Sequence, residues 1–194
     1  MANKKNYLEN DLVKKFLEDY KDARGKEYDQ TRIVGNNGYT VGQSFTLTGE
    51  IEYKTNEING TKSVYWVLLT ESGAELSLMS LMGVSSLKGY STDSAKEFPV
   101  EFYNATTKSK DSRTVTATVG ADFDFDDVWQ PPTRNLLELA GMIASTDLNL
   151  KGKKVKYLGT VVKDFTAKKD SEQNGEKVKK DYKRVIETRL WSME

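Results

Sequence analysis

Apolar and polar residues alternate with a period of two in two long stretches of the chain. This is the pattern of β-strands that have one buried and one solvated face. The first stretch, residues 44–70, has Asn59-Gly60 near its centre, and the second, residues 155–191, has Asn174-Gly175. Because Asn-Gly favours the tight turn between paired strands, we predict two long β-hairpins.

A period of three to four residues replaces this alternation in two other segments. Residues 6–23 carry Leu and aromatic side chains at helical spacing with charged residues between them, which predicts an amphipathic helix. Farther along the chain, Pro131-Pro132 is followed by Thr133, which we expect to cap a second helix whose buried stripe includes Leu136 and Ile143.

These elements give a predicted domain organisation. An N-terminal helical arm, residues 1–25, precedes a single β-rich domain, residues 40–194. The domain contains an insertion at about residues 84–130, in which short strands are predicted near residues 100–103 and 113–119. The expected fold class is therefore mainly β (α+β), with one helix before the domain and one inside it.

The order of these elements is three strands, an insertion, a helix and two strands. This order resembles that of oligonucleotide/oligosaccharide-binding (OB) barrels, over residues 44–82 and 133–191. The resemblance implies a small β-barrel in which the loop between the last two strands grips nucleic acid. An unrelated β-sandwich with appended helices is the alternative.

Composition removes many kinds of chemistry. The 194 residues include no Cys and no His, which excludes disulfides, thiolate nucleophiles and Ser-His-Asp triads. The densest carboxylate cluster, residues 122–127, lacks the Gly and the Glu that a calcium loop needs. Alternation instead predicts that Phe123 and Phe125 face the core. We expect no cofactor, no metal and no enzymatic activity.

A third functional class, a small carboxylate enzyme or a carbohydrate-binding module, ranks last. Glycoside hydrolysis needs two carboxylates across a cleft and no His. Glu50, Glu52 and Glu71 are the candidate acids, but nothing in the sequence places two of them across a cleft.

Charge is distributed unevenly along the chain. Residues 151–184 hold twelve Lys and Arg against five Asp and Glu, whereas the whole chain has a formal net charge of zero. A basic hairpin with aromatic side chains could bind single-stranded nucleic acid by phosphate attraction and base stacking. The candidate nucleic-acid-binding residues are Tyr53, Tyr65, Trp66, Lys154, Lys156, Tyr157, Phe165, Tyr182 and Lys183.

The same separation of charge suits packing against neighbouring proteins, in a homo- or hetero-oligomer. The chain resembles the auxiliary capsid proteins of tailed-phage virions in its lack of Cys, its high β content and its extended polar segments. We rank this non-enzymatic assembly role first and nucleic-acid binding second. For the helix residues, packing inside the chain is the alternative interpretation. The candidate partner-binding residues are Leu12, Phe16, Tyr20, Lys168, Lys169, Lys177, Lys179 and Lys180.

Hydropathy argues against a membrane location. The longest wholly apolar run, residues 64–69, is far shorter than a membrane span. The N-terminus carries no apolar segment typical of a secretory signal. We therefore expect no membrane partner, and a location in a virion or in the host cytoplasm.

Overall fold

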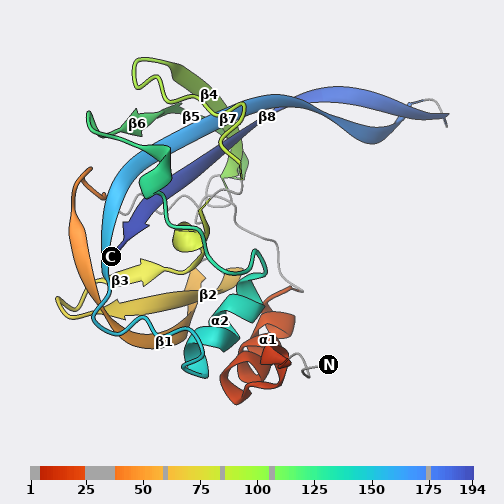
Figure 1. The fold of residues 1–194 in the computed structure, drawn as a ribbon. Coiled ribbons are helices and arrows are strands. Elements are labelled where there is room, and N and C mark those ends of the chain that lie inside the picture. Colours follow the sequence, from red (N-terminus) through yellow and green to blue (C-terminus); the bar gives the residue numbers. More distant parts are fainter. Residues whose placement is uncertain (1–4, 25–37, 59–60, 84–85, 105–107, 174–175) are drawn as a thin grey trace.

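Two long antiparallel hairpins dominate the computed structural model, which describes residues 5–24, 38–58, 61–83, 86–104, 108–173 and 176–194 (Figure 1). In the first hairpin, β1 (Ser44–Ile58) pairs with β2 (Thr61–Thr70). In the second, β7 (Lys154–Gln173) pairs with β8 (Glu176–Met193). The alternation of the sequence therefore predicts both hairpins correctly, although the Asn-Gly turns themselves lie outside the described residues.

The hairpins belong to one antiparallel sheet. Its strand order is β3-β2-β1-β7-β6, and β8 pairs with β7. The short strands β3 (Glu75–Ser77) and β6 (Thr118–Val119) lie along β2 and β7 respectively. Only residues Ser44 to Thr46 of β1 pair with β7, so the two hairpins share one end and diverge from it.

Strands within the predicted insertion form a separate two-stranded sheet. It consists of β4 (Glu97–Asn104) and β5 (Ser109–Thr116). Phe98 and Val115 from this sheet are buried in one cluster with Val162 of β7. The insertion therefore packs against the β7–β8 hairpin.

The largest core lies between the first hairpin and the helices. The described helices here are α1 (Asp11–Arg24) and α2 (Leu136–Ala144), with two short 3-10 helices, η1 (Tyr7–Glu9) before α1 and η3 (Met79–Met82) after β3. None of the described helices combines the length and the hydropathy needed to cross a bilayer. The core that these helices share with the strands includes Val13, Phe16, Trp66, Leu68, Leu139, Ile143 and Trp191.

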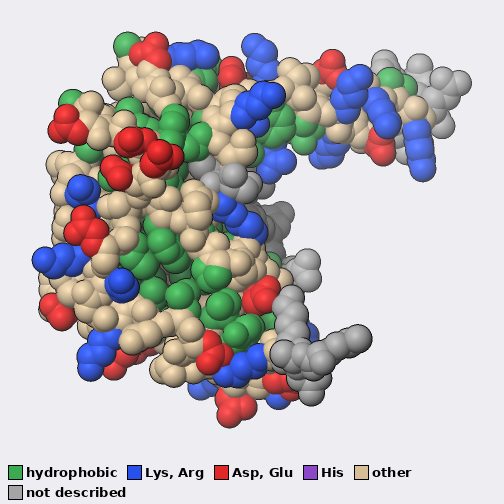
Figure 2. Space-filling model, in the orientation of Figure 1, with side chains coloured by type: hydrophobic (Ala, Val, Ile, Leu, Met, Phe, Trp, Pro, Cys, Tyr) green, Lys and Arg blue, Asp and Glu red, His purple; other side chains and the backbone are tan. Residues whose placement is uncertain are grey.

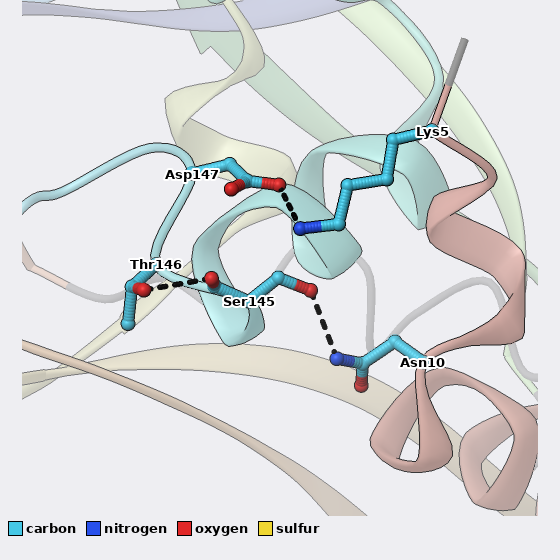
Figure 3. Close-up of polar contacts among 5 residues, drawn as sticks. All are labelled: Lys5, Asn10, Ser145, Thr146 and Asp147. Carbon is cyan, nitrogen blue, oxygen red and sulfur yellow. Dashed lines mark hydrogen bonds and ion pairs between the residues drawn. The ribbon is translucent and has the colours of Figure 1, made fainter. Parts of the chain in front are cut away.

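The N-terminal segment is tied to α2 by polar contacts as well (Figure 3). The Lys5 ammonium forms an ion pair with Asp147, and Asn10 Nδ2 donates to Ser145 Oγ at 3.1 Å. The described part of the predicted N-terminal arm is thus integrated into the domain rather than projecting from it.

The cap of α2 differs from the prediction. Asn135, not Thr133, is the capping residue, and its side-chain oxygen accepts from the backbone N–H groups of Leu137 and Glu138 at 3.0 and 3.2 Å. Thr133 supports this cap from outside, because its hydroxyl oxygen accepts from the Asn135 N–H at 3.1 Å. Both residue types are good caps, and the one closer to the apolar stripe is used.

Candidate partner-binding surface

The β7–β8 hairpin extends far beyond the rest of the molecule (Figure 1). Its ladder continues from the pair Lys163–Ile186 to the pair Gln173–Glu176. Among the described residues, no other strand pairs with this part, which we call the arm (residues 163–173 and 176–186). At a rise of about 3.4 Å per residue, eleven residues per strand give an arm of roughly 35 Å. A two-stranded ribbon of this kind is only marginally stable alone.

One face of the arm balances its own charges. Residues directly opposite each other on paired strands share a face. On this charge-paired face, Asp170 and Asp181 each lie opposite a lysine. The two pairs are Lys168–Asp181 and Asp170–Lys179. Such opposite-charge pairs stabilise a ladder modestly, so this face needs no external counter-charge.

The other face is apolar and basic. Its successive pairs are Phe165–Arg184, Ala167–Tyr182, Lys169–Lys180 and Ser171–Val178. Across these four pairs the apolar-basic face has no Asp or Glu. Tyr182 and Val178 are 41% and 37% exposed, and Lys and Arg side chains line the arm (Figure 2). Lys169 and Lys180 lie directly opposite each other, which is unfavourable without an external anion.

The predicted partner-binding lysines lie on both faces of the arm. Lys169 and Lys180 lie together on the apolar-basic face, beside Tyr182. Lys168, Lys177 and Lys179 are exposed on the charge-paired face. The ladder that separates them pairs residues whose numbers sum to a constant, and this register is the one that the predicted two-residue Asn-Gly turn implies. This signal was present in the sequence, but the prediction did not use it.

The helical part of the predicted partner surface is mostly internal. Phe16 is only 5% exposed and stacks on Trp66, with ring centroids 4.6 Å apart. Leu12 is half-buried, and Tyr20 lies at the rim with 36% of its surface exposed. For Phe16, packing inside the chain is therefore the correct interpretation, because its ring is used by its own core.

Two predicted base-stacking residues are also buried, which corrects their assignment. Trp66 and Tyr157 are 2% and 4% exposed, and their rings pack in the main core. Tyr53 is half-buried, and its hydroxyl donates to Asp19 Oδ2 at 2.9 Å. Tyr65 remains 40% exposed on the first hairpin. Large aromatic residues on strands most often face a core, and these follow that rule.

The remaining nucleic-acid candidates do not form one surface. Lys154 and Lys156 are exposed at the start of β7, whereas Phe165 and Tyr182 lie on the arm. Lys183 lies opposite Thr166 on the charge-paired face. Of the predicted stacking residues, Phe165 and Tyr182 lie on one face of the arm, whereas Tyr53 and Trp66 meet against the main core, with ring centroids 5.7 Å apart.

Burial raises the pKa of Tyr157, whose hydroxyl is hydrogen-bonded to Thr160. The folded state therefore holds this proton more tightly than the unfolded state. Its contribution to stability is complete below pH about 10 and is lost as the pH rises through the higher folded pKa. We predict that the urea midpoint of the native protein falls more steeply above pH about 10 than that of Tyr157→Phe. Equal slopes in the two proteins would contradict this.

The acidic segment near β6 is not arranged as a metal site. Among the described residues, no group of three or more carboxylates is placed to hold a metal ion. The short 3-10 helix η4 (Phe125–Asp127) interrupts the expected alternation. Phe123 packs partly against a buried cluster, but Phe125 is 41% exposed. The prediction that both face the core is thus wrong for Phe125.

Two shallow grooves lie near the first residues of the β-rich domain. The larger, of about 460 Å³, is lined by Glu187 and Arg189 of β8 and by Arg113 of β5. Arg113 Nη2 donates to Glu187 Oε2 at 2.9 Å. Glu187 is the only carboxylate among the described lining residues of this groove, and Glu75 is the only one in the other. Neither groove supplies the carboxylate pair of a glycosidase.

Comparison with known proteins gives no family assignment. No protein-family model, no curated protein sequence and no solved structure matches the chain. Inference about function therefore depends on the molecule's own surface, of which the arm is the most distinctive part.

Proposed function

We propose that the protein is a non-enzymatic structural component of a protein assembly, and that its arm binds a neighbouring protein. The observation that carries this proposal is the arm itself. No further strand in the described part of the chain pairs with it, and it exposes Tyr182 and Val178 on one face. Docking on a neighbour would cover this apolar surface and stabilise a ribbon that is marginal alone.

The setting that we propose is a phage virion, with this chain as an auxiliary capsid protein. A chain without Cys has no thiol or disulfide that depends on the redox environment, and a β-rich body with a long arm suits contact with neighbouring subunits. We also propose that the main sheet is an OB-like barrel. The order β3-β2-β1-β7-β8 supports it, as does the position of α2 between β3 and β7 in the chain. Trp191 Nε1 of β8 donates at 3.1 Å to Ser80 Oγ of η3, the 3-10 helix that follows β3, so β8 contacts the segment next to the other end of this order.

A second candidate function is binding of single-stranded nucleic acid. The apolar-basic face favours it, because Phe165 and Tyr182 lie among Lys169, Lys180 and Arg184. Stacking and phosphate attraction would then act on one face. The burial of Trp66 and Tyr157 counts against a binding surface that continues onto the body.

One experiment separates the two functions. Fluorescence anisotropy with labelled oligo-dT across a salt series is combined with light scattering on the same samples. We expect no salt-sensitive binding, and a mass above the 21.9 kDa of the monomer. Micromolar binding that weakens as salt rises, and that is lost in Tyr182→Ala but kept in Tyr65→Ala, would overturn the assembly role.

A further inference from the structure

We infer that the neighbour bound by the arm is a second copy of the same chain. The copies would associate head to tail, with the apolar-basic face of one arm on the acidic body of the next copy. This inference rests on the proposed function, because it names the partner of the same surface.

Charge complementarity selects a second copy as the partner. The arm (residues 163–173 and 176–186) carries eight Lys and Arg against five Asp and Glu, an excess of three positive charges, and the whole chain is neutral, so the remaining residues carry three negative charges in excess. A basic arm and an acidic body on one chain attract each other between copies. Acidic side chains are visible on the side of the body away from the arm's tip (Figure 2).

The body also offers apolar surface beside its carboxylates. Phe125 is 41% exposed and packs edge-on against Phe123, with centroids 4.7 Å apart. Asp122 and Asp127 flank these rings and are exposed. This mixture of acid and aromatic groups is complementary to the mixture of lysine, tyrosine and valine on the apolar-basic face.

The apolar-basic face cannot pair well with itself. A two-fold contact would place Lys169, Lys180 and Arg184 of one arm against the same cations of its partner, at a cost from like-charge repulsion. Contact with a different surface avoids this cost. Such heterologous contacts build rings or filaments rather than closed dimers.

The opposed lysines give the inference its sharpest support. Lys169 and Lys180 repel each other in the isolated arm, whereas the next rungs on the charge-paired face are complementary. Carboxylates of a second copy would relieve this repulsion. Association therefore stabilises the arm at the position where the isolated arm is least favourable.

Two variants with the same charge change test the inference. Lys169→Gln/Lys180→Gln removes two cations from the apolar-basic face, and Lys168→Gln/Lys179→Gln removes two from the charge-paired face of the same strands. Sedimentation velocity over a concentration series measures association. We expect the first variant to weaken self-association by about tenfold or more, and the second by about twofold or less. The native association should also weaken as salt rises.

Stability measurements exclude a trivial explanation. At a concentration low enough for native protein and variants to be monomeric, the first variant only removes a repulsive pair, so its thermal midpoint should not fall. The second leaves Asp181 and Asp170 without their opposite lysines, so its midpoint should fall slightly. The variant that associates more weakly is thus expected to be the one that keeps its stability. A general loss of stability therefore cannot explain its weaker association.

Charge exchange identifies the two surfaces. Lys169→Glu/Lys180→Glu and Asp122→Lys/Asp127→Lys should each be monomeric alone, and a mixture of the two should associate. A native protein that stays monomeric, equal weakening by both glutamine variants, or no association in the mixture would overturn the head-to-tail contact. A monomeric protein that also fails to bind oligo-dT would indicate that the arm binds a different protein. Binding of oligo-dT would overturn the proposed function itself.

Discussion

Replacing Gly159 by alanine is expected to destabilise the fold by about 3–5 kcal/mol. Gly159 has a φ of 136°, which an L-residue rarely adopts. An added Cβ would lie 2.0 Å from Thr118 O and 2.6 Å from Val119 Cα. Both are backbone atoms of β6, the strand that pairs with Gly159. The methyl group therefore fits only if β6 separates from β7.

A second glycine provides the control for backbone strain. Gly73 has a φ of 79°, and a Cβ added there would meet no atom within 4 Å. Gly73→Ala should therefore cost only about 1–2 kcal/mol. Urea unfolding followed by tryptophan fluorescence measures both variants. Similar losses in the two would show that the close approach of β6 contributes nothing.

The close approach at Gly159 also positions the insertion on the β7–β8 hairpin, at the base of the arm. β6 follows β5 after Ala117, which is fully buried with Val162 of β7. On the opposite strand of the hairpin, Val185 packs partly against the same cluster. Separation of β6 is therefore expected to loosen β4 and β5 as well. Faster hydrogen exchange in β5 of Gly159→Ala would reveal this coupling.

The sequence predicts the elements of this fold well because their periodicity is local. Phe45 and Leu47 lie on the alternating stretch that forms β1, and Gly49, which interrupts its apolar positions, lies within the register shift between Leu47 and Ile51. The apolar residues of α1 recur at helical spacing, and Val13 and Phe16 are indeed buried. Hairpins and amphipathic helices need no long-range information.

The faces of two-sided apolar strands could not be predicted in the same way. Residues 64–69 are apolar on both sides, so the pattern does not show that Trp66 is buried and Tyr65 exposed. That choice depends on α1, which is far away in the sequence and stacks Phe16 on Trp66. The close approach of β6 to Gly159 could not be predicted either, since β6 lies in the insertion. Long-range packing decides both the burial of Trp66 and the contact at Gly159.

Replacing Phe16 by alanine is expected to cost about 3–5 kcal/mol, as for other fully buried aromatic side chains. The Phe16 ring stacks on Trp66 and meets Tyr53 edge-on at 5.7 Å between centroids. Truncation would leave a cavity between α1 and β2. Tyr20→Ala, one turn later on the same helix, should cost about 1 kcal/mol, because Tyr20 lies at the rim.

Deleting residues 1–24 tests the same contact on a larger scale. The deletion removes Val13 and Phe16 from the core, and it also removes the Lys5 ion pair with Asp147 (Figure 3). We expect a protein that has lost its cooperative unfolding transition, measured by circular dichroism and urea titration. A truncated protein that is folded but no longer associates would instead assign the helix to contacts between copies. Phe16→Ala distinguishes these cases independently. If Phe16 packs inside the chain, this variant should lose much of its stability, and the association that we propose for the arm should stay unchanged.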